Sequence, residues 1–232
     1  MRKNGSRFIS IAQYRTTDLF VFALILALSE VLTFFAVHWL PDQAIYSVSF
    51  MIPIVLTVMM RWGWPGAFYA AGSGLIFCLT QASAARGIDY ASYIIGNSFI
   101  ALMLIPLYLI GKDRIRAKWW GSALFAVGGW ACVYLGKSLV WTIAFAISPV
   151  AGAYIWSGFA YYAVADLFSL IIGVLVILIL RKLNGMFEDQ VEYLKRVDKE
   201  RKEKMRIDQF GENLGEIDEE TFNILNKDND LF

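Results

Sequence analysis

Long apolar runs are the feature that most limits how this chain can fold. Several stretches of about 20 residues carry one charged residue or none, and a helix of that length crosses the roughly 30 Å hydrocarbon core of a bilayer. Apolar side chains make up 58% of the 232 residues and charged side chains only 18%, unlike a soluble domain. The sequence therefore predicts an all-α integral membrane protein.

The apolar runs predict six transmembrane helices within a membrane domain of residues 18–180. Short junctions with charged, proline or glycine residues separate most of them, and Pro53 predicts a kink in the second. The predicted spans are 18–38, 44–60, 66–85, 91–111, 121–143 and 157–180.

The distribution of Lys and Arg predicts the orientation in the membrane. Positive residues favour the cytoplasmic side of transmembrane helices, and one set of junctions holds nearly all of them, whereas the other set holds only Arg86. We therefore expect both termini, including the basic segment 1–17, in the cytoplasm. The cytoplasmic set is Arg2, Lys3, Arg7, Arg15, Arg61, Lys112, Arg114, Arg116, Lys118, Arg181 and Lys182.

The tail, residues 181–232, differs in composition from the membrane domain. Its first half is net basic and predicts a cytoplasmic helix over 183–206 that continues the sixth span. The rest is acidic and expected to be partly disordered, with a short helix at "IDEETFNIL" (217–225). The tail is interpreted either as a solvated extension or as a docking element for a cytoplasmic partner.

Motifs of enzymes and nucleotide-binding proteins are missing from the sequence. It contains no phosphate-binding loop, no metalloprotease box and no G-x-S-x-G elbow. Cys78 and Cys132 lie within spans without His partners, so no metal site is predicted. We expect no catalytic residues, no metal, no cofactor and no nucleic-acid partner, and any ATPase would be a separate chain.

Four polar residues inside the spans are the main candidates for a site, because buried charge is costly in lipid. They are Glu30, Asn97, Lys137 and Asp166. Counted along alternating span directions, all four lie roughly 9–15 Å below the outer ends of their helices, at about 1.5 Å per residue.

Aromatic residues accompany three of these polar groups at helical spacing. Lys137 shares a face with Tyr134 and Trp141, Asp166 with Tyr162, and Asn97 with Tyr93. This pattern is typical of an outward-facing small-molecule pocket with a few convergent polar groups. The alternative is a structural Lys137–Asp166 ion pair with aromatic packing around it, and the two interpretations overlap.

The order of these features resembles the substrate-binding S component of energy-coupling factor (ECF) vitamin transporters, over about residues 15–182. Three stretches are similar to that family. They are the A-x-x-x-A motif "ALILA" on the first helix (Ala23 and Ala27), "SFMIPIVLTVMMRWGWPGAFYAAGSGLIFCLTQ" (49–81) and "YIIGNSFIALMLIPLYLIGK" (93–112). The long tail departs from the family, whose members end soon after the sixth helix.

The resemblance implies a subunit of the bacterial plasma membrane that captures a vitamin-like molecule at the outer face. Uptake would be driven by a membrane coupling subunit and separate ATPase subunits. In that family the alanine motif faces the coupling subunit, which gives Ala23 and Ala27 a partner-interface role. Glu30 follows Ala23 by seven residues and is expected on the same face, so it ranks below the other candidate ligand-binding residues.

Two other classes stay open. A membrane sensor or scaffold would bind a ligand in its spans and signal through the tail. An intramembrane enzyme would need a nucleophile–base pair, which the sequence lacks. The ligand itself is not identified, although a pocket with a cation and an anion suits a zwitterion or a carboxylate-bearing heterocycle.

Overall fold

The computed structural model describes residues 11–39, 49–81, 87–144 and 151–206, and over these residues the chain is helical with no strand. The chain divides into two units, Met1–Gln190 and Val191–Phe232. The predicted helix at 217–225 lies outside the described residues.

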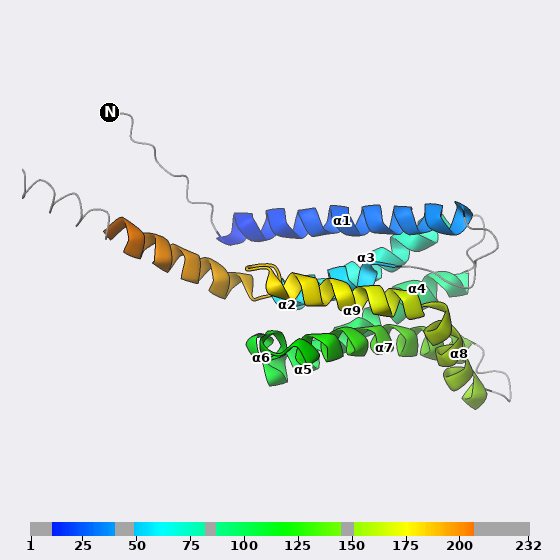
Figure 1. Ribbon diagram of the computed structural model, residues 1–232. Coiled ribbons are helices and arrows are strands. Elements are labelled where there is room, and N and C mark those ends of the chain that lie inside the picture. The colour runs from blue at the N-terminus through cyan, green and yellow to red at the C-terminus, as the bar shows by residue number, and fades with distance from the viewer. Residues whose placement is uncertain (1–10, 40–48, 82–86, 145–150, 207–232) are drawn as a thin grey trace, which may run out of the picture. The chain divides into compact units, whose positions relative to one another are not determined.

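The first unit is a helical bundle (Figure 1). Its elements in chain order are α1 (Ile11–Trp39), α2 (Met51–Trp62), α3 (Pro65–Thr80), α4 (Gly87–Ser98), the 3₁₀ helix η2 (Phe99–Met103), α5 (Leu104–Ile110), α6 (Lys112–Ala117), α7 (Trp119–Ala144), α8 (Ala151–Ala165) and α9 (Leu167–Lys182).

Three of the described helical segments are long and apolar enough to cross a membrane, namely Ile11–Phe35, Gly87–Ile110 and Trp119–Ala144. The bent pair Trp156–Ala165 and Leu167–Lys182 makes a fourth if it counts as one span. These helices suggest a membrane protein. The second and third predicted spans correspond to the shorter apolar helices α2 and α3.

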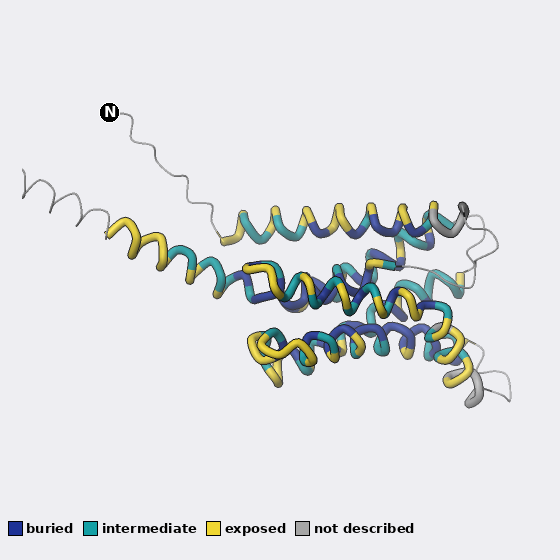
Figure 2. The backbone as a smooth tube through the Cα atoms, in the orientation of Figure 1, coloured by how far each residue is buried: buried dark blue, intermediate teal, exposed yellow. Residues whose placement is uncertain are grey.

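The surface of the bundle is apolar where a lipid-facing surface is expected. Along α1 one face is exposed and the other is buried against α2 and α3 (Figure 2). Large apolar side chains such as Phe20, Leu28 and Leu32 are among those exposed on α1. Exposed apolar surface of this extent is unusual in a soluble monomer and is ordinary for a protein surrounded by lipid.

Helices α2 and α7 form the centre of the bundle. Helix α7 contacts α2, α4, α8, α9 and η2, and α2 is buried on nearly every side. Val55, Leu56 and Met59 of α2 are fully buried. A helix that is apolar all round belongs in a core, which explains why α2 is buried although it is short.

Three predicted details of the helices were wrong. Pro53 lies in the first turn of α2, where the backbone N–H has no helical partner, so it begins the helix instead of kinking it. The sixth predicted span is bent by 64° at Asp166, between α8 and α9. The predicted helix 183–206 is interrupted over 183–189, where Gly185 has φ +77°, a left-handed conformation that glycine adopts without strain.

Residues 183–190 fold back onto the basic end of the bundle. Phe187 is fully buried in the core, and Glu188 accepts hydrogen bonds from Arg116 (2.6 Å) and from the backbone N–H of Gly185. Asp189 forms an ion pair with Lys112. These contacts stop the helix at Lys182, because they require the chain to turn.

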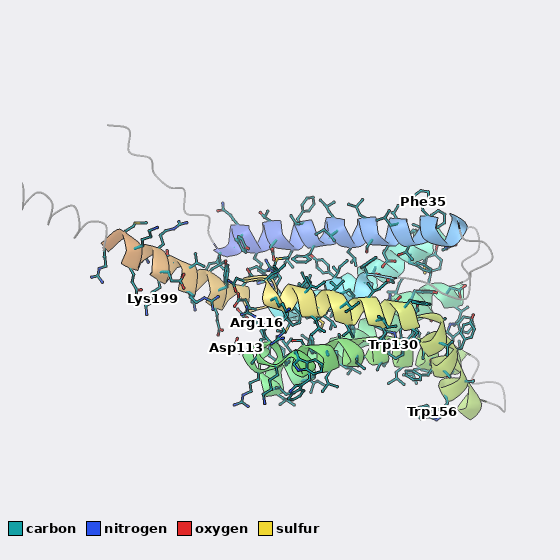
Figure 3. The ribbon with its side chains drawn as sticks, viewed as in Figure 1. Phe35, Asp113, Arg116, Trp130, Trp156 and Lys199 are labelled. Carbon is teal, nitrogen blue, oxygen red and sulfur yellow. The ribbon has the colours of Figure 1, made fainter. Side chains whose placement is uncertain are left out.

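In the second unit, the described residues 191–206 form an exposed helix. It carries the side-chain pairs Lys199–Glu203 and Lys202–Asp198 at i,i+4, and Figure 3 labels Lys199. Exposed pairs of this kind contribute only a few tenths of a kcal/mol to the stability of a helix.

Candidate functional site

One small cavity collects polar residues from several helices of the bundle. It has a volume of about 60 Å³ and is lined from α1, α2, α3, α4, α7 and the junction between α8 and α9. The lining residues are Glu30, Thr33, Ser49, Met51, Ile52, Ser73, Phe77, Tyr93, Asn97, Tyr134, Lys137 and Asp166. Residues distant in the sequence therefore meet at one point inside the bundle.

Close packing of α4 on α7 brings Asn97 and Lys137 to this cavity. A Cβ atom added to Gly96 would collide with the backbone of Lys137, and one added to Gly136 would collide with the carbonyl oxygen of Gly96. Each glycine directly precedes a polar lining residue. Small residues that let two helices approach closely are typical of membrane bundles, and here they place an amide and an ammonium group against one cavity.

Lys137 is held between two tyrosine rings. Its Nζ atom lies 4.5 Å from the ring centroid of Tyr93 and 5.0 Å from that of Tyr134, and the residue is only 7% exposed. Cation–π contacts of this kind strengthen when they are removed from water. The aromatic faces thus offset part of the cost of burying the ammonium group, and they leave the cavity with an aromatic wall.

Asp166 lies where α8 gives way to α9. Tyr134 donates a short hydrogen bond from its hydroxyl to Asp166 Oδ2, and Ser169 Oγ lies 3.4 Å from Oδ1. The backbone N–H of Ser49 in turn donates to Ser169 Oγ at 2.9 Å. The bend that sequence reasoning missed thus presents a buried carboxylate to the cavity.

Glu30 belongs to the same cavity and is 3% exposed. Its Oε1 atom accepts a hydrogen bond from Ser73 Oγ at 2.6 Å. Ala23, seven residues earlier on α1, is exposed, and Ala27 is half-buried. Helical phase predicts one shared face for these residues, but Glu30 is buried whereas Ala23 is exposed.

Asn97 presents a free acceptor to the cavity. It is 3% exposed, and among the residues that the structure describes its Oδ1 atom has no hydrogen-bond partner. A buried acceptor left without a donor costs about 1–3 kcal/mol. Asn97 is therefore a candidate to accept a hydrogen bond from a molecule in the cavity.

Most, but not all, of the predicted residues meet here. Lys137, Asp166, Asn97, Tyr134, Tyr93 and Glu30 line the cavity. Trp141 is half-buried and is not among the lining residues, because the second ring against Lys137 comes from Tyr93 on α4. The side chain of Tyr162 lies outside the part of the chain that the structure describes.

The sequence did not predict the other six lining residues, which are Thr33, Ser49, Met51, Ile52, Ser73 and Phe77. Ser73 had a usable signal in the sequence, because it is a polar residue next to a glycine within an apolar run; in the structure an added Cβ at Gly74 would collide with the backbone of Tyr93. The same glycine-plus-polar pairing occurs at Gly96 and Gly136. Thr33 and Ser49 have no such signal.

The chemistry of the cavity is that of a binding site for a small polar molecule. It offers two carboxylates, one ammonium group, one free amide oxygen and two tyrosine rings. Small-molecule pockets have volumes of roughly 300–1,000 Å³. At about 60 Å³ this cavity holds only a few water molecules, so a larger ligand must spread the surrounding helices. Among the described residues no His, Cys, Asp and Glu cluster could hold a metal ion.

No protein family, curated protein or solved structure was found to match this chain.

Proposed function

We propose that this chain is the membrane-embedded, substrate-binding subunit of an ECF-type transporter, which captures a vitamin-like small molecule from outside the cell. The observation that carries the proposal is the meeting of Glu30, Asn97, Lys137 and Asp166 around one aromatic-walled cavity inside an apolar bundle. Buried charges in a membrane domain mark substrate pathways and sites, because they are otherwise too costly to keep.

The position of the cavity along the helices supports binding from the outer side. Met51 lines the cavity, whereas Arg61, at the other end of α2, belongs to the basic end of the bundle. Ten residues of helix separate the two by roughly 15 Å. With the basic end in the cytoplasm, the cavity lies in the outer half of the bilayer. We assign six crossings to α1, α2, α3, α4–η2–α5, α7 and α8–α9.

The side chains of the cavity favour one class of ligand. Its two carboxylates outnumber its single ammonium group, and the Asn97 acceptor requires a donor. We infer a planar heterocycle that stacks on Tyr93 or Tyr134 and carries amino or ring N–H donors, with a carboxylate tolerated next to Lys137. Such a molecule combines the polar anchors and apolar surface that buried sites recognise.

Transport by a reconstituted complex tests the proposal. The chain is placed in lipid vesicles with the coupling and ATPase subunits of an ECF transporter, and a mixture of water-soluble vitamins is added outside. We expect at least one vitamin to accumulate in an ATP-dependent manner, as measured by mass spectrometry of the washed vesicles. Vesicles that lack this chain are the control, and equal accumulation in both would contradict the proposal.

A second candidate is a membrane sensor that signals through its tail. It is favoured by the ion pairs Lys112–Asp189 and Arg116–Glu188, which attach the first part of the tail, residues 183–190, to the bundle. Removal of residues 207–232 separates the two functions. A transport subunit keeps its vesicle uptake after this truncation, whereas a sensor shows no uptake before or after it.

A further inference from the structure

A second cavity, separate from the polar one, lies at the basic end of the bundle between α5, α6 and α7. Its volume is about 540 Å³ and its lining is mostly apolar. The residues that line it are Met103, Pro106, Ile110, Arg114, Ile115, Ala117, Lys118, Trp120, Gly121, Leu124 and Phe125, and we call it the α5–α7 groove.

The groove exists because α5 departs from α7. Helix α4 and η2 pack closely along α7, whereas the main neighbours of α5 are η2 and α6. The chain changes its neighbours after the 3₁₀ segment Phe99–Met103 and before Pro106, a residue that has no backbone N–H to donate. Apolar side chains on both sides of the gap are left facing it, from the buried Phe125 to the exposed Ile110 and Leu124.

The charges of α6 are divided between two sides. Lys112 and Arg116 are spaced i,i+4 and form ion pairs with Asp189 and Glu188. Arg114 lies about half a helical turn from both of them on α6, and Lys118 follows the end of α6 in an extended conformation; both Arg114 and Lys118 line the groove. Figure 3 labels Arg116 and Asp113 on this short helix.

The two cations of the groove have no anionic partner within the described residues. No carboxylate there lies within salt-bridge distance of Arg114 or Lys118, and Lys118 Nζ instead lies 5.4 Å from the ring centroid of Trp120. Two neighbouring cations without a counter-ion favour a ligand that brings an anion.

Aromatic residues mark the groove as lying at the level of lipid headgroups. Trp119 and Trp120 are 64% and 49% exposed, and Tyr108 on α5 is 64% exposed. Tyr108 approaches Gly63 in the turn that ends α2, so the same belt continues around this end of the bundle. Tryptophan and tyrosine gather at the boundary between hydrocarbon and water, and the unpaired cations lie at this boundary.

We propose that the α5–α7 groove is a binding site for one anionic phospholipid. An acyl chain lies along Ile110, Leu124 and Phe125, and the headgroup phosphate is held by Arg114 and Lys118. Basic pockets between helices at the cytoplasmic side of membrane proteins bind anionic headgroups in this way. The assignment rests on the chain lying in a bilayer and is independent of the transport function, so either can fail alone.

Native mass spectrometry with defined lipids tests this assignment. The detergent-purified full chain is titrated with dioleoyl phosphatidylglycerol or with dioleoyl phosphatidylcholine, which share their acyl chains. We expect the first bound phosphatidylglycerol to have an apparent Kd about tenfold lower than phosphatidylcholine, equivalent to about 1.4 kcal/mol. Glycerol 3-phosphate, which has the anion without the chains, should show no adduct. Equal affinity for the two lipids would overturn the proposal, and so would an adduct with glycerol 3-phosphate of similar strength.

Variants show whether this preference belongs to the groove. Arg114→Gln with Lys118→Gln should reduce the preference for phosphatidylglycerol to less than about threefold, equivalent to about 0.6 kcal/mol. The matched control, Lys199→Gln with Lys202→Gln, removes the same charge from two exposed positions of the helix 191–206 and should leave the preference for phosphatidylglycerol unchanged. Leu124→Trp fills the groove and should weaken binding of both lipids. An unchanged preference for phosphatidylglycerol in the Arg114→Gln, Lys118→Gln variant would overturn the assignment. It would also be overturned if the wild-type chain formed a dimer and Leu124→Trp abolished that dimer, because the groove would then hold a second copy of the chain.

Discussion

At the residue scale, Arg61 on α2 and Asn97 on α4 show how a satisfied buried polar group differs from an available one. Arg61 is 3% exposed and donates to both carboxylate oxygens of Asp18, with Nε–Oδ2 at 2.9 Å and Nη2–Oδ1 at 2.6 Å. It also donates to the carbonyl oxygen of Gly185. The Arg61 guanidinium group thus donates hydrogen bonds to α1 and to the turn after α9, and these contacts hold α1, α2 and that turn together. Asn97, in contrast, keeps an unused acceptor.

Removal of Asp18 should therefore damage folding. Asp18→Ala leaves the Arg61 guanidinium buried without its anion, and breaking a buried pair in this way costs about 3–5 kcal/mol. Thermal unfolding in detergent should show a clearly lower melting temperature than wild type. The control is Asp113→Ala, which removes an exposed carboxylate from α6 and should change little. Equal, small changes in both variants would mean that the Arg61–Asp18 contact is not a structural clamp.

The candidate site could be predicted largely at this scale. Glu30, Lys137 and Asp166 are conspicuous because each interrupts an apolar run, and in lipid a charge must have a partner. Trp141 is not among the residues that line the cavity, and phase along one helix does not say which neighbouring helix supplies the second ring. Tyr93 fills that place, and its position depends on how closely α4 approaches α7.

At the element scale, helix ends were harder to predict than helices. The long apolar runs predicted α1, α7 and the α4–α5 region, because the length and apolarity of these segments alone distinguish them. The bend at Asp166 had no glycine or proline to mark it. The break after Lys182 was marked by Gly185, but the contacts of Phe187 and Glu188 that hold the turn come from other helices.

The close crossing of α4 and α7 gives a prediction with an internal control. Gly136→Ala should destabilise the protein by about 1–3 kcal/mol, the usual cost of inserting a methyl group where no space exists. Gly72→Ala on α3, where an added Cβ meets nothing within 4 Å, should be neutral or stabilising because alanine favours helix more than glycine. Thermal unfolding of both variants measures the difference, and similar melting temperatures would show that the α4–α7 contact is loose.

At the scale of the whole molecule, the account depends on which end of the bundle faces the cytoplasm. The basic end carries Arg61, Arg116 and the α5–α7 groove, and the polar cavity lies toward the other end. Positive-inside orientation then places the cavity near the outer surface. A reversed chain would present the same cavity to the cytoplasm and would not suit a capture subunit.

Labelling of intact cells tests this orientation. In a variant with Cys78→Ala and Cys132→Ala, single cysteines are introduced as Gly87→Cys and Ala117→Cys, at two exposed positions. A membrane-impermeant maleimide should label the first in intact cells and the second only after lysis. Labelling of Ala117→Cys but not of Gly87→Cys in intact cells would show the opposite orientation.

Lys137 and Asp166 line one cavity, and in the proposed function both bind the ligand and do not serve only the fold. Lys137→Met alone leaves nearby carboxylates without their cation and should destabilise the protein by a few kcal/mol. Adding Asp166→Asn removes the second charge while keeping an acceptor for the Tyr134 hydroxyl, so the double variant should recover most of the lost stability.

The most direct measurement is the amount of small molecule that stays bound to this double variant after purification from cells grown in rich medium. Mass spectrometry of the extracted compound is compared with wild type at equal amounts of folded protein. We expect a double variant that melts near the wild-type temperature but retains less than about a tenth of the compound, a loss of at least 1.4 kcal/mol in binding. A folded double variant that retains the wild-type amount would contradict the account, because Lys137 and Asp166 would then serve only the fold.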